Sequence, residues 1–236
     1  MSRSIRVAAL AAVLFVLPGI ASAGKLIATG MTIGFPGNNM QPIANNIANY
    51  AFTSSIPATN QFAIFQTHDP WGATVVKTGI TSGGHTFSVF TPAQLAGFAF
   101  NTYRVVVLNW DDHFLGDFNT QYQAVIPMLE AYVNAGGVVW LQASIQGSPG
   151  NSLNLPFGGT LTYELQPNNF IIDPASPMMA GITSPIPGNS ASHARIGTAP
   201  PGTAHNVCSV GTTAGGPVTL YDLVSTPVEL QSFSIQ

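Results

Sequence analysis

Charged side chains are scarce in this sequence of 236 residues: Asp, Glu, Lys and Arg make up 6% of it, where soluble domains average about 25%. Beyond residue 23 the basic residues are Lys25, Lys77, Arg104 and Arg195, which face nine acidic residues, a formal net charge of −5. Four scattered cations cannot form the basic surface that follows a phosphate backbone. The composition therefore excludes a nucleic-acid-binding protein. It predicts a neutral polar surface on which copies of the chain repel one another little.

Cysteine and long apolar runs are nearly absent as well. Cys208 is the only cysteine, so no intramolecular disulfide can form and stability must come from a hydrophobic core. Because Cys208 lies in an alternating, strand-like stretch, we interpret it as a small buried residue rather than a nucleophile. Beyond residue 23 the sequence has no run of about 18 apolar residues. This excludes a membrane span after signal cleavage.

The first 23 residues have the three parts of a secretory signal peptide. Arg3 and Arg6 give a positive start, Val7 to Ile20 is apolar, and Ala21-Ser22-Ala23 matches the small-x-small cleavage pattern. An apolar run of this length is shorter than the roughly 20 residues that span a bilayer, which favours cleavage over anchoring. We therefore expect a protein that is secreted, periplasmic or placed at the cell surface, with Gly24 as its mature N-terminus.

Strand-like runs alternate with helical ones, a pattern typical of a parallel sheet covered by helices. The clearest strand runs from Tyr103 to Asn109, and the clearest helix, Thr120 to Asn134, ends before Gly136-Gly137. We predict an α/β fold, a three-layer flavodoxin-like sandwich with a mostly parallel central sheet, over residues 24–223. The other strands are expected at Lys25–Ile33, Gln61–Gln66, Thr86–Phe90, Val138–Gln142, Thr160–Glu164, Phe170–Ile172, Asn206–Val210 and Val218–Tyr221, with helices at Pro42–Phe52, from Asp69 and from Thr91. Residues 174–190 are expected to form loops with at most one helical turn.

The stretch from Tyr103 to Gly147 resembles the class I glutamine amidotransferase-like superfamily, near the trehalose-utilisation-protein family. The likeness lies in the strand Val105–Asn109, the polar loop Trp110–Asp117 and the strand Val138–Gln142. A second segment, Ile172-Asp173-Pro174-Ala175-Ser176-Pro177-Met178, is similar to the Asp-Pro-x-His-Pro segment of secreted bacterial members. The resemblance implies a flavodoxin-like fold for the whole predicted domain.

The sequence departs from the catalytic members of that superfamily. No cysteine stands at the nucleophile position, where Ser144 is the nearest candidate, and Asp111-Asp112-His113 replaces their glycine pair. A His-x-Glu pair near the C-terminus is missing too, and so are the closing strand and helix. Residues 224–236 are interpreted as a tail or a truncated linker. The resemblance therefore implies a module without the amidotransferase reaction, and we expect no cofactor and no resident metal.

In an open parallel sheet, ligands bind beyond the carboxyl ends of the strands. One hypothesis for this edge is a serine hydrolase in which Ser144 is the nucleophile, His193 is the base and Asp112 orients the imidazole. However, the sequence around Ser144 lacks the flanking glycines of the Gly-x-Ser-x-Gly elbow. We keep the hydrolase as an alternative.

A second hypothesis for the same edge is binding without catalysis. Trp71 and Trp110 would form a platform for a sugar ring if they are exposed, whereas Trp140 lies within a strand predicted to be buried. The acidic and histidine side chains offer oxygen and nitrogen atoms for a divalent ion, but neighbours on one loop seldom all face one point. The candidate ligand-binding residues are Trp71, Trp110, Asp111, His113 and His68.

Three functions follow from these observations. The leading one is a non-catalytic, amidotransferase-like module that binds an extracellular or cell-surface ligand, for example a glycan. The first alternative is the hydrolase that uses Ser144 and His193. The second is a self-assembling surface protein, because a surface of such low charge does little to keep copies apart.

Overall fold

The computed structural model describes residues 24–110, 115–145, 151–200, 204–210 and 218–224. The predicted signal peptide and residues 225–236 of the predicted tail lie outside this part of the chain. Its helices and strands are β1 (Lys25–Thr29), α1 (Gln41–Ala51), β2 (Asn60–Phe65), η1 (Pro70–Gly72), α2 (Val75–Ser82), β3 (Phe87–Phe90), η2 (Pro92–Gly97), η3 (Phe100–Thr102), β4 (Tyr103–Trp110), α3 (Leu115–Asn134), β5 (Val138–Ala143), β6 (Ser152–Asn154), η4 (Pro156–Gly158), β7 (Thr160–Ile171), η5 (Pro177–Met179), β8 (Ile186–Thr198), β9 (Ala204–Val210) and β10 (Val218–Val224).

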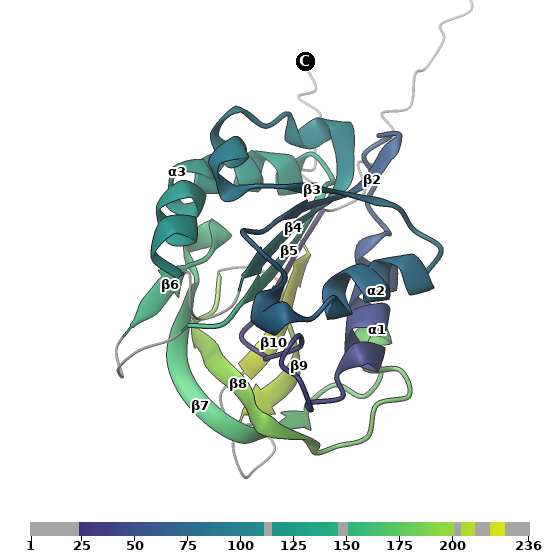
Figure 1. Cartoon of the computed structure of the whole chain (residues 1–236), viewed down its shortest axis with the longest axis vertical. Coiled ribbons are helices and arrows are strands. Elements are labelled where there is room, and N and C mark those ends of the chain that lie inside the picture. Colours follow the sequence, from purple (N-terminus) through teal and green to yellow (C-terminus); the bar gives the residue numbers. More distant parts are fainter. Residues whose placement is uncertain (1–23, 111–114, 146–150, 201–203, 211–217, 225–236) are drawn as a thin grey trace, which may run out of the picture.

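Five parallel strands form the centre of the sheet, in the spatial order β3-β2-β4-β5-β1 (Figure 1). Helices α1 and α2 pack on one face, and α3 packs on the other together with η2 and η3. This is the predicted three-layer α/β fold, which is confirmed. From β2 the chain first moves outward to β3 and then returns past β2 to β4. The carboxyl ends of β2 and β4 are therefore a switch point, where open α/β sheets bind ligands.

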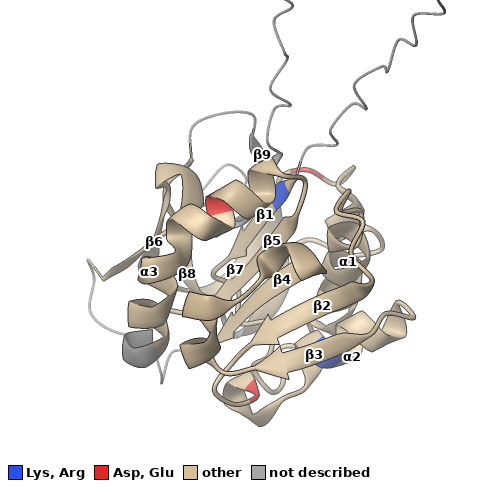
Figure 2. Cartoon of the chain, turned by 90° about the horizontal axis from the view of Figure 1, so that it is seen from above, with Lys and Arg blue, Asp and Glu red and all other residues tan. Residues whose placement is uncertain are grey.

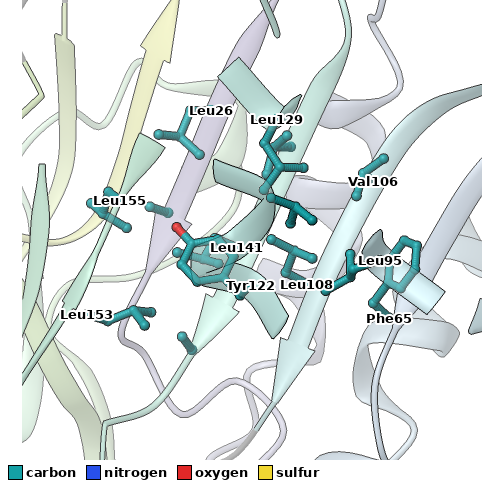
Figure 3. Close-up of a cluster of buried hydrophobic side chains, with 14 of the residues drawn as sticks. Leu26, Phe65, Leu95, Val106, Leu108, Tyr122, Leu129, Leu141, Leu153 and Leu155 are labelled. Atoms are coloured by element: carbon teal, nitrogen blue, oxygen red, sulfur yellow. The ribbon is translucent and has the colours of Figure 1, made fainter. Parts of the chain in front are cut away.

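Each face of the parallel strands buries its own hydrophobic cluster. On the α3 side, Tyr122 lies in one cluster with Leu108 of β4 and Leu141 of β5 (Figure 3). On the α1 side, Trp140 of β5 is fully buried in a cluster that includes Ile43 of α1, as predicted for this tryptophan. Burial of one such side chain contributes about 1.5–3 kcal/mol. These two clusters hold the layers together.

Several helix boundaries follow local signals in the sequence. Pro42 stands in the first turn of α1, where a missing N–H group costs nothing. Thr91 and Gln94 form the capping box at the start of η2. Helix α3 begins earlier than the expected Thr120 and is followed by Gly136, whose φ of 97° ends it.

The helix predicted from Asp69 is interrupted. One turn, η1, ends at Gly72, and α2 starts only at Val75. The break follows from the backbone: Trp71 has φ 52° and Gly72 has φ 72°, values that a right-handed helix does not contain. A bulky residue rarely adopts positive φ, so the backbone conformation of Trp71 in this turn is unusual.

The C-terminal half adds antiparallel strands to the parallel centre, in the order β10-β9-β7-β6 beyond β1, with β8 paired to β7 (Figure 1). The prediction of two short strands near Thr160 and Phe170 is wrong, because a single strand, β7, runs unbroken from Thr160 to Ile171. The loop prediction for residues 174–190 is partly wrong, since β8 starts at Ile186. Pro185 and Pro187 led to the prediction of a loop here, because proline is rare within strands. Pro187, near the start of β8, is accommodated by the pairing with β7, which includes register shifts.

Charges are few and separate on the described ribbon (Figure 2). Two pairs of opposite charge are present there: Lys77 with Asp69, and Arg195 with Glu164 across β7 and β8. The low charge of the sequence thus leaves most of the surface to uncharged side chains. In the part of the chain that the structure describes, no helix is both long and apolar enough to cross a bilayer.

Candidate binding site at the carboxyl edge

Four polar side chains form a row across the carboxyl edge of the parallel strands. Thr29 ends β1, Gln66 follows β2, Asn109 lies near the end of β4, and Gln142 near the end of β5, and all four are buried. Gln142 is in register with both Asn109 and Thr29. The residue two positions before each of them belongs to the hydrophobic cluster beneath α1 and α2, so the row faces the same side. Those residues are Ile27, Ile64, Val107 and Trp140.

A chain of hydrogen bonds connects this row to the surface. Lys77 of α2 lies 2.6 Å from Asp69 Oδ1, which also accepts a hydrogen bond of 2.8 Å from Gln66 Nε2. Gln66 Oε1 in turn accepts from Asn109 Nδ2 at 2.9 Å. Burial alone would raise the pKa of Asp69, but the hydrogen bonds from Lys77 and Gln66, with the Lys77 charge, lower that pKa below its ordinary value. Asp69 is therefore a carboxylate at neutral pH.

The other end of the row is tied to the loop after β1. Gln142 Nε2 donates to the Met31 carbonyl oxygen at 2.5 Å, and Met31 forms an isolated antiparallel bridge with Ser192 of β8. The carbonyl oxygen of Gly30 accepts from the backbone N–H groups of His193, at 3.0 Å, and of Ala194, at 3.3 Å. These contacts place Ser192 and His193, which are far along the chain, beside the ends of β1 and β5.

Several buried oxygen atoms at this edge have no hydrogen-bond partner within the described residues. They are Asn109 Oδ1, Gln142 Oε1, Ser144 Oγ and Ser192 Oγ, on side chains that are at most 2% exposed. A buried polar atom left without a partner costs about 1–3 kcal/mol. Such groups ordinarily bond to water or to a ligand. The edge thus combines neutral polar groups with unused bonding capacity.

Aromatic rings lie at the half-buried rim of the same edge. Trp71 meets Phe35 edge to face, with ring centroids 5.9 Å apart, and it meets His193 in the same manner at 6.4 Å. Gly34 lies beneath the indole, where a β-carbon would approach Trp71 Cε3 to 3.3 Å. Positive φ at a large side chain is often found at functional sites, where the surrounding structure maintains the strain. Trp71 is thus a predicted ligand-binding residue that the structure brings to the rim.

Two surface hollows contain only uncharged lining residues. The one of about 360 Å³ lies where β2 and β3 end, between Thr67, Thr91 and Thr120. The other, of about 550 Å³, lies at the start of α1 between Asn39, Pro42 and the segment Gly181–Gly188. Neither is built to hold an ion by opposite charge. Their chemistry agrees with the neutral row at the carboxyl edge.

The structure does not assemble the predicted hydrolase. Ser144 is fully buried, and its Oγ has no hydrogen-bond partner among the described residues, so the predicted hydrogen bond to His193 is absent. The imidazole of His193 instead meets the Trp71 ring. Asp112, the third member of the predicted triad, lies outside the described residues. A nucleophile is activated by a base within about 2.6–3.2 Å, and the described residues bring no base to Ser144 Oγ. The catalytic roles of Ser144 and His193 stay predictions.

Trp110 also departs from its predicted role. It is 3% exposed and packs on Phe118 and Tyr122 of the α3 layer, with ring centroids 4.2 Å and 5.7 Å away. The platform required an exposed indole, and this condition is not met at Trp110. Trp110 is the first residue after Asn109 and points to the opposite face, into the core. Its indole belongs to the hydrophobic cluster rather than to the rim.

The remaining predicted site residues are only partly placed. His68 is exposed in the loop after β2, three residues past the end of that strand. Asp111 and His113 lie outside the described residues, so their roles stay predictions. Within the described ranges, no three His, Cys, Asp or Glu side chains gather closely enough to hold a metal ion.

The polar row itself was not predicted from the sequence. An uncharged polar residue stands at the equivalent position, at or next to the carboxyl end of four parallel strands: Thr29, Gln66, Asn109 and Gln142. That recurrence after four apolar runs was the available signal. The sequence alone does not show that these four residues lie side by side, because that depends on the strand order and register, which are non-local properties.

Comparison of the chain with protein-family models, with curated proteins and with solved structures finds no match.

Proposed function

We propose that this chain is an exported, non-catalytic, amidotransferase-like module that binds a neutral glycan at the carboxyl edge of its parallel strands. The observation that carries the proposal is the combination of an aromatic rim at Trp71 with the uncharged polar row behind it. Sugars present apolar ring faces to aromatic side chains and hydroxyl groups to amides and hydroxyls, so they match both features.

Charge and chemistry at this edge support binding over catalysis. The Asp69 carboxylate and Lys77 neutralise each other at the margin, and the row itself is made of amide and hydroxyl groups. No base contacts Ser144 Oγ within the described residues. A secreted location, as the N-terminal segment predicts, would expose such a site to extracellular or cell-surface glycans.

Replacement of Trp71 tests the proposal. We expect Trp71→Ala to weaken glycan binding about tenfold or more, because the apolar ring contact is lost, while Trp71→Phe retains part of the affinity. The measurement is a glycan array followed by isothermal titration calorimetry on the glycans that bind wild type.

Phe157 supplies a matched control for this experiment. It occupies a second Pro-aromatic-Gly turn, with φ 64° against 52° at Trp71, but it packs against the α3-side cluster. Phe157→Ala should leave glycan affinity unchanged. Equal loss in both variants, or wild-type affinity in Trp71→Ala, would refute the role of the rim.

A second candidate function, self-association, is favoured by the free edge of the sheet. Strand β3 pairs with β2 alone among the described strands, and its sequence Phe-Ser-Val-Phe carries no charge and no proline. Natural edge strands usually carry charged residues or proline, which prevent pairing between copies. We therefore propose β3 as the place where a second copy could add a strand.

A further inference from the structure

The amide groups of the polar row have a fixed direction. A carboxylate can only accept hydrogen bonds, so Gln66 must turn its NH2 group toward Asp69. Its oxygen then faces Asn109, which must donate through Nδ2. The direction set at Asp69 is thereby passed through Gln66, and it leaves Asn109 Oδ1 as the end of the hydrogen-bond chain that has no partner among the described residues.

The Gln142 amide is fixed from the other side. Its Nε2 donates to the backbone carbonyl oxygen of Met31, which can only accept. Gln142 Oε1 is therefore the amide atom that is left without a partner among the described residues. Asn109 and Gln142 are in register on neighbouring strands, so two oriented amide oxygens stand side by side on one face. Both are at least nine-tenths buried and lack a partner among the described residues.

We propose that Asn109 Oδ1 and Gln142 Oε1 form an acceptor pair that recognises a hydroxyl group of the ligand and rejects anionic groups. This inference rests on the proposed function and names the chemistry of its ligand. A carboxylate or phosphate brought to two amide oxygens would find lone pairs facing lone pairs. A hydroxyl group donates its proton to such an oxygen.

Neighbouring groups favour a hydroxyl over a cation. The indole Nε1–H of Trp140, two residues before Gln142 on the same face, is also buried without a partner in the described part of the chain. It needs an acceptor, which a hydroxyl oxygen provides and a cation does not. Ser144 and Ser192 can donate or accept, so they adapt to a hydroxyl in either direction.

Removal of the outer anchor tests this inference without touching the acceptor pair. In Asp69→Ala the Gln66 amide loses the partner that fixes its direction, so the Asn109 amide can turn. We expect this variant to bind neutral oligosaccharides of glucose, galactose, mannose or N-acetylglucosamine about tenfold more weakly, the equivalent of one hydrogen bond. Its discrimination against the matching uronic acids should shrink as well.

Lys77→Met is the matched control, because it removes the ion pair but keeps the carboxylate that orients Gln66. Its affinity should stay within about twofold of wild type. A wild-type protein that prefers uronic acids would overturn the proposed acceptor pair. Equal losses of affinity in Asp69→Ala and Lys77→Met would overturn it as well. If Trp71→Ala loses affinity while Asp69→Ala keeps it, glycan binding stands and the acceptor pair fails.

A second measurement decides the matter if no oligosaccharide binds and the proposed function itself fails. In a high-resolution crystal structure of the free protein, the acceptor pair requires ordered water within about 3 Å of Asn109 Oδ1 and Gln142 Oε1. An amide NH2 group of either residue turned into that position would refute the inference.

Discussion

His85 precedes β3 with its imidazole against two phenylalanine rings. Its ring centroid lies 4.0 Å from that of Phe52 and 5.6 Å from that of Phe62. Burial lowers the pKa of His85 below its ordinary value of 6.5, because the charged imidazolium loses hydration there. The folded chain therefore holds this histidine in its neutral form more strongly than the unfolded chain does.

This residue makes folding stability depend on pH. Below pH 6.5 the unfolded chain binds a proton that the folded chain resists, so the contribution of His85 to stability falls as pH falls toward its lowered pKa and is constant above 6.5. We expect a lower urea midpoint at pH 5 than at pH 8, and a smaller difference in His85→Phe. His68→Gln, at an exposed histidine, is the control. An unchanged difference in His85→Phe would contradict the assignment.

Among the elements, the contact between the end of β1 and β8 joins the two halves of the sheet. A β-carbon at Gly30 would lie 2.3 Å from the carbonyl oxygen of Ala194, closer than any real contact. That carbonyl belongs to the backbone of β8, which cannot yield without losing its pairing with β7.

We expect Gly30→Ala to destabilise the protein by about 2 kcal/mol or more, because the overlap forces the two backbones apart. Gly97→Ala is the control, since a β-carbon there meets nothing within 4 Å. Urea unfolding followed by circular dichroism measures both. A stability of Gly30→Ala equal to wild type would mean that β8 does not depend on this close approach.

The same elements show how far the sequence could predict the structure. Strands β4 and β5 were predicted nearly to the residue, because continuous apolar runs such as Val105–Leu108 are typical of strands buried on both faces. Strand β8 was not predicted, because its proline, glycines and serines favour turns and its conformation depends on β7. At the site, Trp71 was predicted from its position after β2, whereas the in-register row required knowledge of the strand order.

For the whole molecule, the low charge and the free edge of β3 act together. Val89 on this strand is 46% exposed, and the strand itself carries no charge that would oppose a second copy. Val89→Lys adds a charge to the edge, and we expect it to reduce concentration-dependent association in sedimentation velocity.

Met128→Lys on α3 provides the comparison, because Met128 is also exposed, at 39%, but lies on a helix rather than at the sheet edge. It should leave association as in wild type. Association that persists in Val89→Lys, or that both substitutions abolish alike, would exclude β3 as the contact.

Strand β1 pairs in parallel with β5 on one side and antiparallel with β10 on the other. Its neighbour β10 comes last among the described strands, so β1 can acquire both partners only after β10 has been synthesised. Contacts of such sequence separation slow folding. The described part of the sheet is therefore completed late in synthesis, a property that would agree with the proposed export.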